Sequence, residues 1–418
     1  MVVCIAGASV LTYGYLAVVA RNLPSAEYAG FGSFWSLALI VAFGVFLPVE
    51  LELARAMSAH PDGDVPARLG RTVLWLVLGC LAAIAATSPF LVPALGGSST
   101  LAPLAALVVV SAGQFLLRGM LLGQGRLVAH GTVLLVDSGL RVLLAWLVGV
   151  VVPDAGSAVY AWTTVIAVAL AHLPLLVLVG RRAGRGGTPP GPALAGPRGG
   201  TGASRMGAAV THLLVGTLSA QVLLNSGPVL ASAVAGATQA GVAAAYVACF
   251  TLVRLPLFVA VPLQSALVPL LVSAARAGGP RAVRAVVLRM IAGTAAAASL
   301  GWVIGDLIGP PLVGLLFGDE YRLPGSTIAL LAAGAGLHIG LIVLTQVLVA
   351  TEQHRRVALV WSTGVAVGLV VFLAVPDLVL RAGLGFTLGT AAALLACTVF
   401  LVRGGLTDLP AEPPPRVG

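Results

Sequence analysis

A few charged and amide side chains interrupt long apolar runs, and these are the residues best suited to chemistry in this sequence. Arg254 lies near the middle of one run and is followed by Pro256 and Pro262, so we expect its helix to be kinked or partly opened. A charge in the centre of a membrane costs about 2.5–3.5 kcal/mol, so the side chain should face a cavity or a partner. Arg254 is a candidate anchor for an anionic substrate; the alternative is a structural ion pair with a carboxylate.

Amide side chains extend this candidate site. The segment 225–228, Asn-Ser-Gly-Pro, is expected to interrupt its helix, because proline removes a backbone hydrogen bond and glycine loosens the preceding turn. Gln221 lies four residues before Asn225 on the same helix face. The candidate cavity-lining amides are Gln221, Asn225 and Gln264. The alternative for 225–228 is a kink that serves packing alone.

Asp137 and Arg141 lie four residues apart, with the acid first, which favours an ion pair within one helix. A self-neutralising structural pair is one interpretation, because a buried pair avoids the cost of either charge alone. The other is a proton or cation site that couples an ion to the function. Asp306, near the end of a later apolar run, is a further ion-coupling candidate.

A second group of charges ends the run 31–56. Glu52 and Arg55 share a helix face, whereas Glu50 points nearly opposite to Glu52. We expect a solvated ion pair here, near a membrane interface, and we expect Arg118 to extend to the same interface. Four isolated histidines should pack or hydrogen-bond rather than bind metal: His130, His172, His212 and His338. The sequence predicts no catalytic residue, metal site or cofactor.

The composition defines the elements that must position these residues. Of 418 residues, 59% are hydrophobic and 9% are charged, against about 25% charged in a soluble domain, and the mean hydropathy is +1.05. This excludes a soluble enzyme, a nucleic-acid binder and a secreted disulfide scaffold. We expect an all-α polytopic membrane protein. Its twelve predicted spans are 2–20, 31–56, 72–95, 101–122, 127–152, 158–179, 206–235, 242–274, 284–307, 326–350, 357–375 and 378–402.

Charge fixes the expected orientation. All 23 basic residues are arginine, and with the N-terminus inside, 18 fall at inner loops and helix ends. Three fall outside: Arg21, Arg322 and Arg381. This is a strong positive-inside pattern. We therefore expect a multi-pass protein of the bacterial cytoplasmic membrane with both termini cytoplasmic, its first span serving as an uncleaved signal anchor.

The longest polar stretch, 181–205, is rich in Gly, Pro and Arg, and this composition predicts a flexible cytoplasmic linker. It divides the chain into two six-helix bundles, 1–180 and 206–403, followed by a disordered tail, 404–418. Weak sequence similarity between the two halves suggests a pseudo-two-fold axis along the membrane normal with a site at the midplane. Chance similarity between apolar helices is the alternative.

The segment 20–32, ARNLPSAEYAGFG, resembles the junction after the first span of polysaccharide flippases of the O-antigen type. Those belong to the multidrug/oligosaccharidyl-lipid/polysaccharide exporter (MOP) superfamily. The segments 241–246 (GVAAAY), 267–270 (LVPL) and 315–318 (LLFG) are similar to further landmarks of that family. Asn225 stands in a span where the family often has an acidic residue, which argues against ion coupling there.

This resemblance implies a protein that exports a lipid-linked glycan by alternating access, with no enzymatic step. Arginines of such flippases hold the pyrophosphate, and the resemblance implies that by position Arg254, Arg21 and Arg55 correspond to them. The implied partners are a lipid-pyrophosphate-linked glycan, membrane lipids and polysaccharide assembly enzymes, with no nucleic acid. A multidrug or cation antiporter of the same superfamily is the alternative, which a carboxylate-lined pocket would favour. A membrane glycosyltransferase is disfavoured because the outer loops are short.

Overall fold

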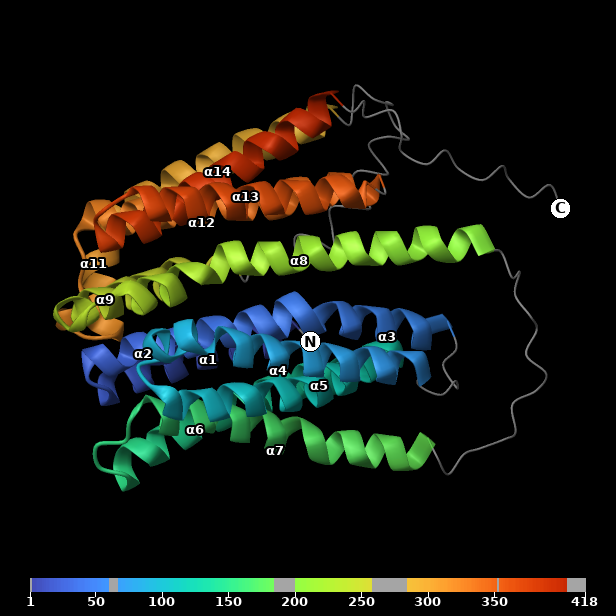
Figure 1. The fold of residues 1–418 in the computed structure, drawn as a ribbon, viewed down its shortest axis with the longest axis horizontal. Helices are drawn as coiled ribbons and strands as arrows, with labels where there is room; N and C mark the ends of the chain where they lie inside the picture. Colours follow the sequence, from blue (N-terminus) through green and yellow to red (C-terminus); the bar gives the residue numbers. More distant parts are fainter. Residues whose placement is uncertain (1, 60–66, 184–199, 258–283, 352, 404–418) are drawn as a thin grey trace. The chain divides into compact units, whose positions relative to one another are not determined.

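The protein is entirely helical over the residues that the computed structural model describes, which are 2–59, 67–183, 200–257, 284–351 and 353–403 (Figure 1). Eleven helices in these ranges are long and apolar enough to cross a membrane. No strand occurs in them. The predicted fold class, an all-α polytopic membrane protein, is confirmed.

The first half of the chain contains α1 (Val2–Asn22), α2 (Ser25–Leu39), a π-helix (Ile40–Phe46), α3 (Leu47–Ala59), α4 (Ala67–Ala94), α5 (Leu101–Gly123), α6 (Leu127–Val151) and α7 (Ser157–Ala183). The second half contains α8 (Gly200–Val234), α9 (Ala240–Val253), a helical segment at Arg284–Leu307, α11 (Gly309–Leu316), α12 (Gly325–Ala350), α13 (His354–Ala374) and α14 (Leu378–Arg403). Short 3₁₀ turns lie at Ser98–Thr100, Ala237–Gln239 and Asp319–Tyr321.

Eleven of the twelve predicted spans correspond to these long helices. The second span begins earlier than predicted, at Ser25, because α2, the π-helix and α3 form one continuous apolar rod. Pro48 has no N–H for the turn before it, and the amide of Leu47 instead bonds to the carbonyl of Ala42, five residues back. The predicted eighth span starts as α9, and its remainder from residue 258 lies outside the described residues.

The helices form two compact units. Unit 1 comprises 1–205, 228–248 and 313–322; unit 2 comprises 206–227, 249–312 and 323–418. Two short stretches of the predicted second bundle, 228–248 and 313–322, thus belong to unit 1. The boundaries of the two predicted bundles stay a prediction. The centre of the predicted linker, 184–199, and the predicted tail, 404–418, lie outside the described residues.

Each unit has its own apolar core. In unit 1, Phe46, Val49, Val108 and Phe115 pack together between α3, α5 and the π-helix. In unit 2, twelve buried residues from α8, α12, α13, α14 and the segment 284–307 form the core, with Trp361 its largest side chain.

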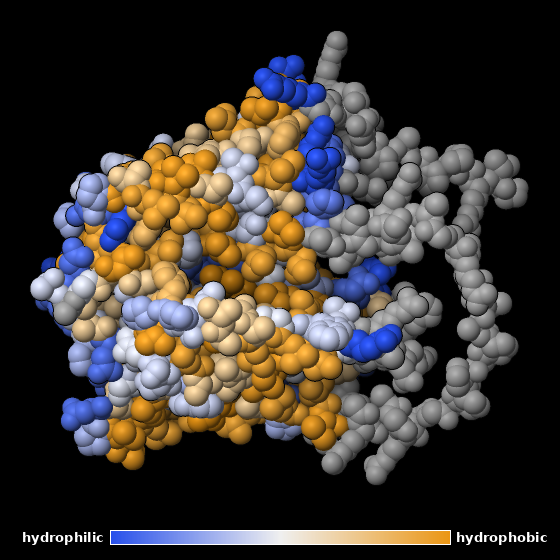
Figure 2. Space-filling model, viewed as in Figure 1, coloured by the Kyte–Doolittle hydropathy of each residue, from blue (hydrophilic) through white to orange (hydrophobic). Residues whose placement is uncertain are grey.

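Large apolar side chains also face outward. Trp75 on α4 is 71% exposed, and apolar residues cover much of the face in Figure 2. Apolar surface of this extent is the surface that lipid covers in a membrane protein.

Candidate functional site

Arg254 is the charged residue at the centre of the candidate site in unit 2. α9 ends at Val253, and residues 254–256 form a turn, which confirms the expected opening before Pro256. The side chain is buried, with 6% of its surface exposed. Its Nη1 donates to Oδ1 of Asn225 at 2.6 Å, and its guanidinium carbon lies 4.9 Å from the centre of the Phe250 ring. A turn, an amide and an aromatic face together hold this cation.

Asn225 and Gln221 form the amide half of this cluster, as predicted from their spacing. Nδ2 of Asn225 donates to both the carbonyl and Oε1 of Gln221 at 3.0 Å, and Asn225 is fully buried. The predicted interruption at 225–228 is wrong, because α8 runs through Pro228 to Val234. Membrane helices tolerate an internal proline where nearby groups satisfy the backbone.

A row of contacting rings extends from Arg254 inside unit 2. Phe250 meets Phe386 edge-to-face, with centroids 5.0 Å apart. The ring of His338 lies 5.7 Å from Phe386 and 5.3 Å from Trp361. His338 is buried and faces the hydroxyl of Thr390, so the expectation that it packs and hydrogen-bonds is confirmed. Phe250 was missed from the sequence, although it precedes Arg254 by four residues and so shares its helix face.

In unit 1, Asp137 and Arg141 form the ion pair that their spacing predicts. Oδ2 of Asp137 lies 2.5 Å from Nη2 of Arg141, and the guanidinium carbon lies 5.6 Å from the centre of the Trp35 ring. Both side chains are largely buried. The hydroxyl of Tyr15, buried in the same unit, contacts the hydroxyl of Thr164 at 2.8 Å. The pair can neutralise itself, so its role as an ion-coupling site stays a prediction.

Two expectations for the charges near α3 are wrong. Glu50, expected at a solvated interface, is 2% exposed, and Arg118, expected to extend to that interface, is buried beside it. Oε2 of Glu50 and Nη2 of Arg118 are 3.1 Å apart. The reason is close packing of α3 on α5, where a Cβ on Gly119 would come within 2.9 Å of the Glu50 carbonyl. The sequence signal was present, since Glu50 points away from exposed Glu52 and therefore toward the neighbouring helix.

His130 on α6 completes this buried group. Its Nε2 lies 3.4 Å from Oε1 of Glu50, which confirms the expectation that it hydrogen-bonds. Among the described residues, no three His, Cys, Asp or Glu side chains are placed to hold a metal ion.

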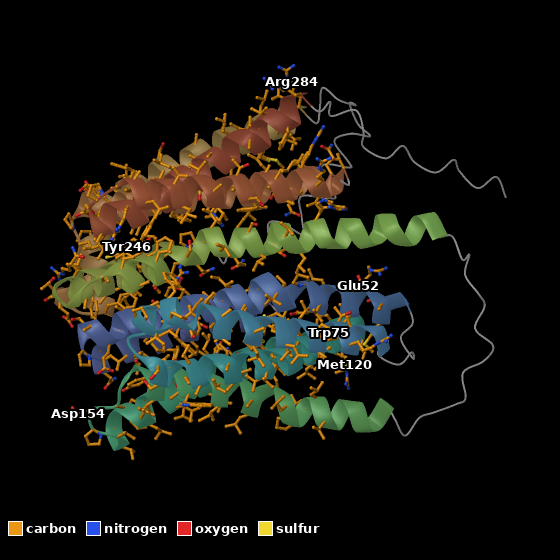
Figure 3. The ribbon with its side chains drawn as sticks, in the orientation of Figure 1. Glu52, Trp75, Met120, Asp154, Tyr246 and Arg284 are labelled. Carbon is orange, nitrogen blue, oxygen red and sulfur yellow. The ribbon has the colours of Figure 1, made fainter. Side chains whose placement is uncertain are left out.

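Arg55 and Arg21, the other two arginines implied by the family resemblance, lie at the surface of unit 1. The side chain of Arg55 is 70% exposed and forms a two-pronged ion pair with Glu52, as the sequence predicts. Arg21 is exposed and donates to the carbonyls of Leu315 and Leu316. It lines a surface pocket together with Asp154, and Figure 3 shows Asp154 and Glu52 at opposite ends of unit 1. Arg21 and Arg55 therefore do not share one anion site.

The end of α1 is held beside Arg21 by a buried phenol. The hydroxyl of Tyr321 donates to the carbonyl of Ala20 at 3.1 Å. Burial raises the pKa of Tyr321 above its usual value, so the phenol stays a neutral donor at physiological pH.

Two predicted site residues remain. Asp306 is exposed, at the end of the segment Arg284–Leu307. Gln264 lies outside the described residues.

The sequence matches no protein-family model and no curated protein. The structure, however, resembles solved transporters. An inward-facing conformation of a multidrug resistance MATE family transporter of the MOP superfamily is 13% identical, with a TM-score of 0.67 over 95% of this chain and 93% of that one. A variant of the MATE transporter VcmN of Vibrio cholerae is 16% identical, with a TM-score of 0.59 over 97% and 96%. A MOP superfamily transporter from Pyrococcus furiosus, described as having a binding pocket of reversed polarity, is 14% identical, with a TM-score of 0.59 over 98% and 96%.

These likenesses establish the fold, which is that of MATE transporters of the MOP superfamily, proteins built of two six-helix bundles. The chain is a multi-pass membrane protein with this fold. The solved structures that this chain resembles are MATE transporters of the MOP superfamily, and these likenesses do not support the O-antigen flippase subtype.

Proposed function

We propose that the protein is a transporter that moves a small organic solute across the membrane by alternating access. The observation that carries this proposal is the likeness, over 95% of the chain, to an inward-facing multidrug resistance transporter. An outward-facing multidrug transporter of the same superfamily also matches, over 95% of this chain with a TM-score of 0.52. A fold solved in both states suits a cycle that exposes one site to each side in turn.

The buried cluster of unit 2 supports solute binding in that unit. Arg254 and Asn225 supply a cation and an amide, and Phe250 supplies an aromatic face within 4.9 Å of the cation. An apolar solute body with an anionic or hydrogen-bond-accepting group would use both kinds of contact. Arg254 is the charged member of this cluster, and it is therefore the group suited to select a solute by charge.

Flipping of a lipid-linked glycan precursor is a second candidate, favoured by one observation. Arg254 is a buried guanidinium at a helix break, and a guanidinium binds phosphate oxygens through two parallel hydrogen bonds. Arg21 and Arg55 lend this candidate no support, since they lie at opposite ends of unit 1. Under this candidate the partners would include polysaccharide assembly enzymes.

The test is transport by the purified protein in proteoliposomes, with fluorescent organic anions and cations as probes. We expect uptake of organic anions by the wild type and a loss of about tenfold or more in Arg254→Ala, because 1.4 kcal/mol of lost binding is a tenfold effect. Arg55→Ala, at an exposed and solvated position, is the matched control and should transport normally.

Absence of transport of every organic probe by well-folded wild-type protein would overturn the solute proposal. Movement of a fluorescent undecaprenyl-pyrophosphate glycan between leaflets, lost in Arg254→Ala, would then establish the second candidate.

A further inference from the structure

A buried acid, a base and an arginine from three helices meet inside unit 1. Glu50 on α3 is 2% exposed and lies 3.1 Å from Arg118 on α5 and 3.4 Å from His130 on α6. We propose that Glu50 and His130 form a proton-binding site, loaded at Nδ1 of His130. Its use to drive transport rests on the proposed function, whereas proton binding itself does not.

The unused ring nitrogen of His130 is the observation that points to a ligand. Nε2 faces the Glu50 carboxylate, so the neutral ring that fits this geometry carries its hydrogen on Nε2. Nδ1 is then a bare acceptor, and it is buried without a hydrogen bond to any described residue. Such a nitrogen costs about 1–3 kcal/mol when nothing satisfies it. A proton at Nδ1 yields an imidazolium whose Nε2–H still points at the carboxylate.

The net charge of Glu50, Arg118 and His130 makes the favoured conformation of this site depend on the proton. With neutral His130, Glu50 and Arg118 cancel and the group is neutral. Uptake of one proton leaves a net positive charge and an unmatched Nδ1–H in a buried place, which is unfavourable without water. The loaded state therefore favours an arrangement in which Nδ1 reaches water, and the empty state favours the packed arrangement described above.

A polar turn lies close in sequence to the site. His130 is the fourth residue of α6, and the turn before this helix, Gln124, Gly125 and Arg126, is exposed. A displacement of about one helical turn at the start of α6 would hydrate Nδ1. Under the predicted topology this end of unit 1 faces the cytoplasm.

The surrounding helices carry other charged and titratable groups. They are Tyr15 on α1, Glu52 and Arg55 on α3, Arg71 on α4, Asp137 and Arg141 on α6, and His172 on α7. Glu52 and Arg55 are paired in water, and Asp137 and Arg141 are paired with each other.

His172 is the competing proton acceptor in unit 1. It is fully buried, its Nδ1 bonds to the Val168 carbonyl at 3.0 Å, and its Nε2 makes no hydrogen bond to a described residue. Arg118, Asp137 and Arg141 all act on it electrostatically. No carboxylate directly contacts its ring among the described ion pairs, whereas Glu50 directly contacts His130, and this favours His130 as the site.

The test is proton uptake by the full-length protein in detergent and weakly buffered solution, followed as the pH is lowered from about 8 to 5, the range in which histidine titrates. We expect the wild type to take up about one proton per chain more than His130→Gln, whose amide can still donate to Glu50. Glu50→Gln should move the same uptake to lower pH, because the carboxylate that stabilises the imidazolium is gone. Glu52→Gln, which removes an exposed carboxylate on the same helix, should leave it in place.

Equal uptake by the wild type and His130→Gln would overturn the proposal, as would loss of the proton in His172→Gln with uptake by His130→Gln intact. If His130→Gln fails to fold, Glu50→Gln alone decides, and an unmoved midpoint overturns the site. The role in transport has a separate readout: in proteoliposomes an imposed pH gradient should change the solute uptake of the wild type, and His130→Gln should lose this response. A wild type that binds this proton but transports no probe would refute the proposed function and leave the proton site standing.

Discussion

Oδ1 of Asn225 accepts a 2.6 Å hydrogen bond from Nη1 of Arg254, which joins the turn after α9 to α8 within unit 2. Gln221 extends the chain of contacts by accepting from Nδ2 of Asn225. The Asn225 amide therefore orients a buried cation. A carboxylate at position 225 would hold Arg254 equally well in space but would compete with an anionic solute for its charge.

This relationship predicts different outcomes for two substitutions of Asn225. Asn225→Leu removes an acceptor from a buried guanidinium and should cost about 1.5–3 kcal/mol of stability, seen as a lower melting temperature in detergent. Asn225→Asp loses the two hydrogen bonds that Nδ2 donates to Gln221 but gains an ion pair with Arg254, so its melting temperature should fall less than that of Asn225→Leu. Its uptake of organic anions should fall about tenfold or more, since 1.4 kcal/mol of competition suffices.

Asn22→Leu is the matched stability control, because Asn22 makes a similar bond to a carbonyl four residues back but is exposed. Unchanged anion uptake by Asn225→Asp would mean that the charge of Arg254 does not bind the solute.

The pair Asp137–Arg141 predicts a non-additive mutant cycle. Asp137→Leu or Arg141→Leu alone leaves one buried charge unmatched, at a cost of about 3–5 kcal/mol. The double variant should be more stable than either single variant, because no uncompensated charge remains. Thermal unfolding of the four proteins in detergent measures this. A well-folded double variant that no longer transports would instead make the pair part of the transport mechanism.

The sequence predicted what depends on local spacing and missed what depends on helix packing. The Asp137–Arg141 and Glu52–Arg55 pairs follow from positions three or four apart on one helix, and both are present. The burial of Glu50 beside Arg118 depends on how closely α3 approaches α5, which hydropathy along one helix does not encode.

The same distinction holds at the helix breaks. The break at Arg254 was predicted from Pro256, and the structure has it there. At Pro228 the same residue type leaves α8 continuous. The carbonyl of Pro228 there accepts from the hydroxyl of Ser33, a residue nearly two hundred positions earlier in the chain. A contact between segments so far apart cannot be read from the local sequence.

Close approach of α3 and α5 predicts that Gly123 tolerates no side chain. A Cβ at this position would lie 2.6 Å from Cβ of Met57 and 2.9 Å from the Ala54 carbonyl. Gly123→Ala should therefore destabilise unit 1 by about 1–3 kcal/mol, the usual cost of overpacking. Gly79→Ala on α4, where a Cβ meets nothing within 4 Å, is the matched control and should be neutral or slightly stabilising. Equal melting temperatures for the two variants would contradict the packing of α3 on α5.

The arginine distribution predicts the orientation of the whole chain, and reporter fusions measure it. A fusion at residue 191, in the predicted linker, should report cytoplasm, since 18 of the 23 arginines fall on that side. Fusions at Gly97, after α4, and at Asp319, after α11, should report the outside, because three predicted spans separate each of them from residue 191. Alkaline phosphatase and green fluorescent protein fusions at the same sites give opposite signals and control for expression. An external signal at residue 191 would reverse the orientation, and with it the expectation that the His130 end of unit 1 faces the cytoplasm.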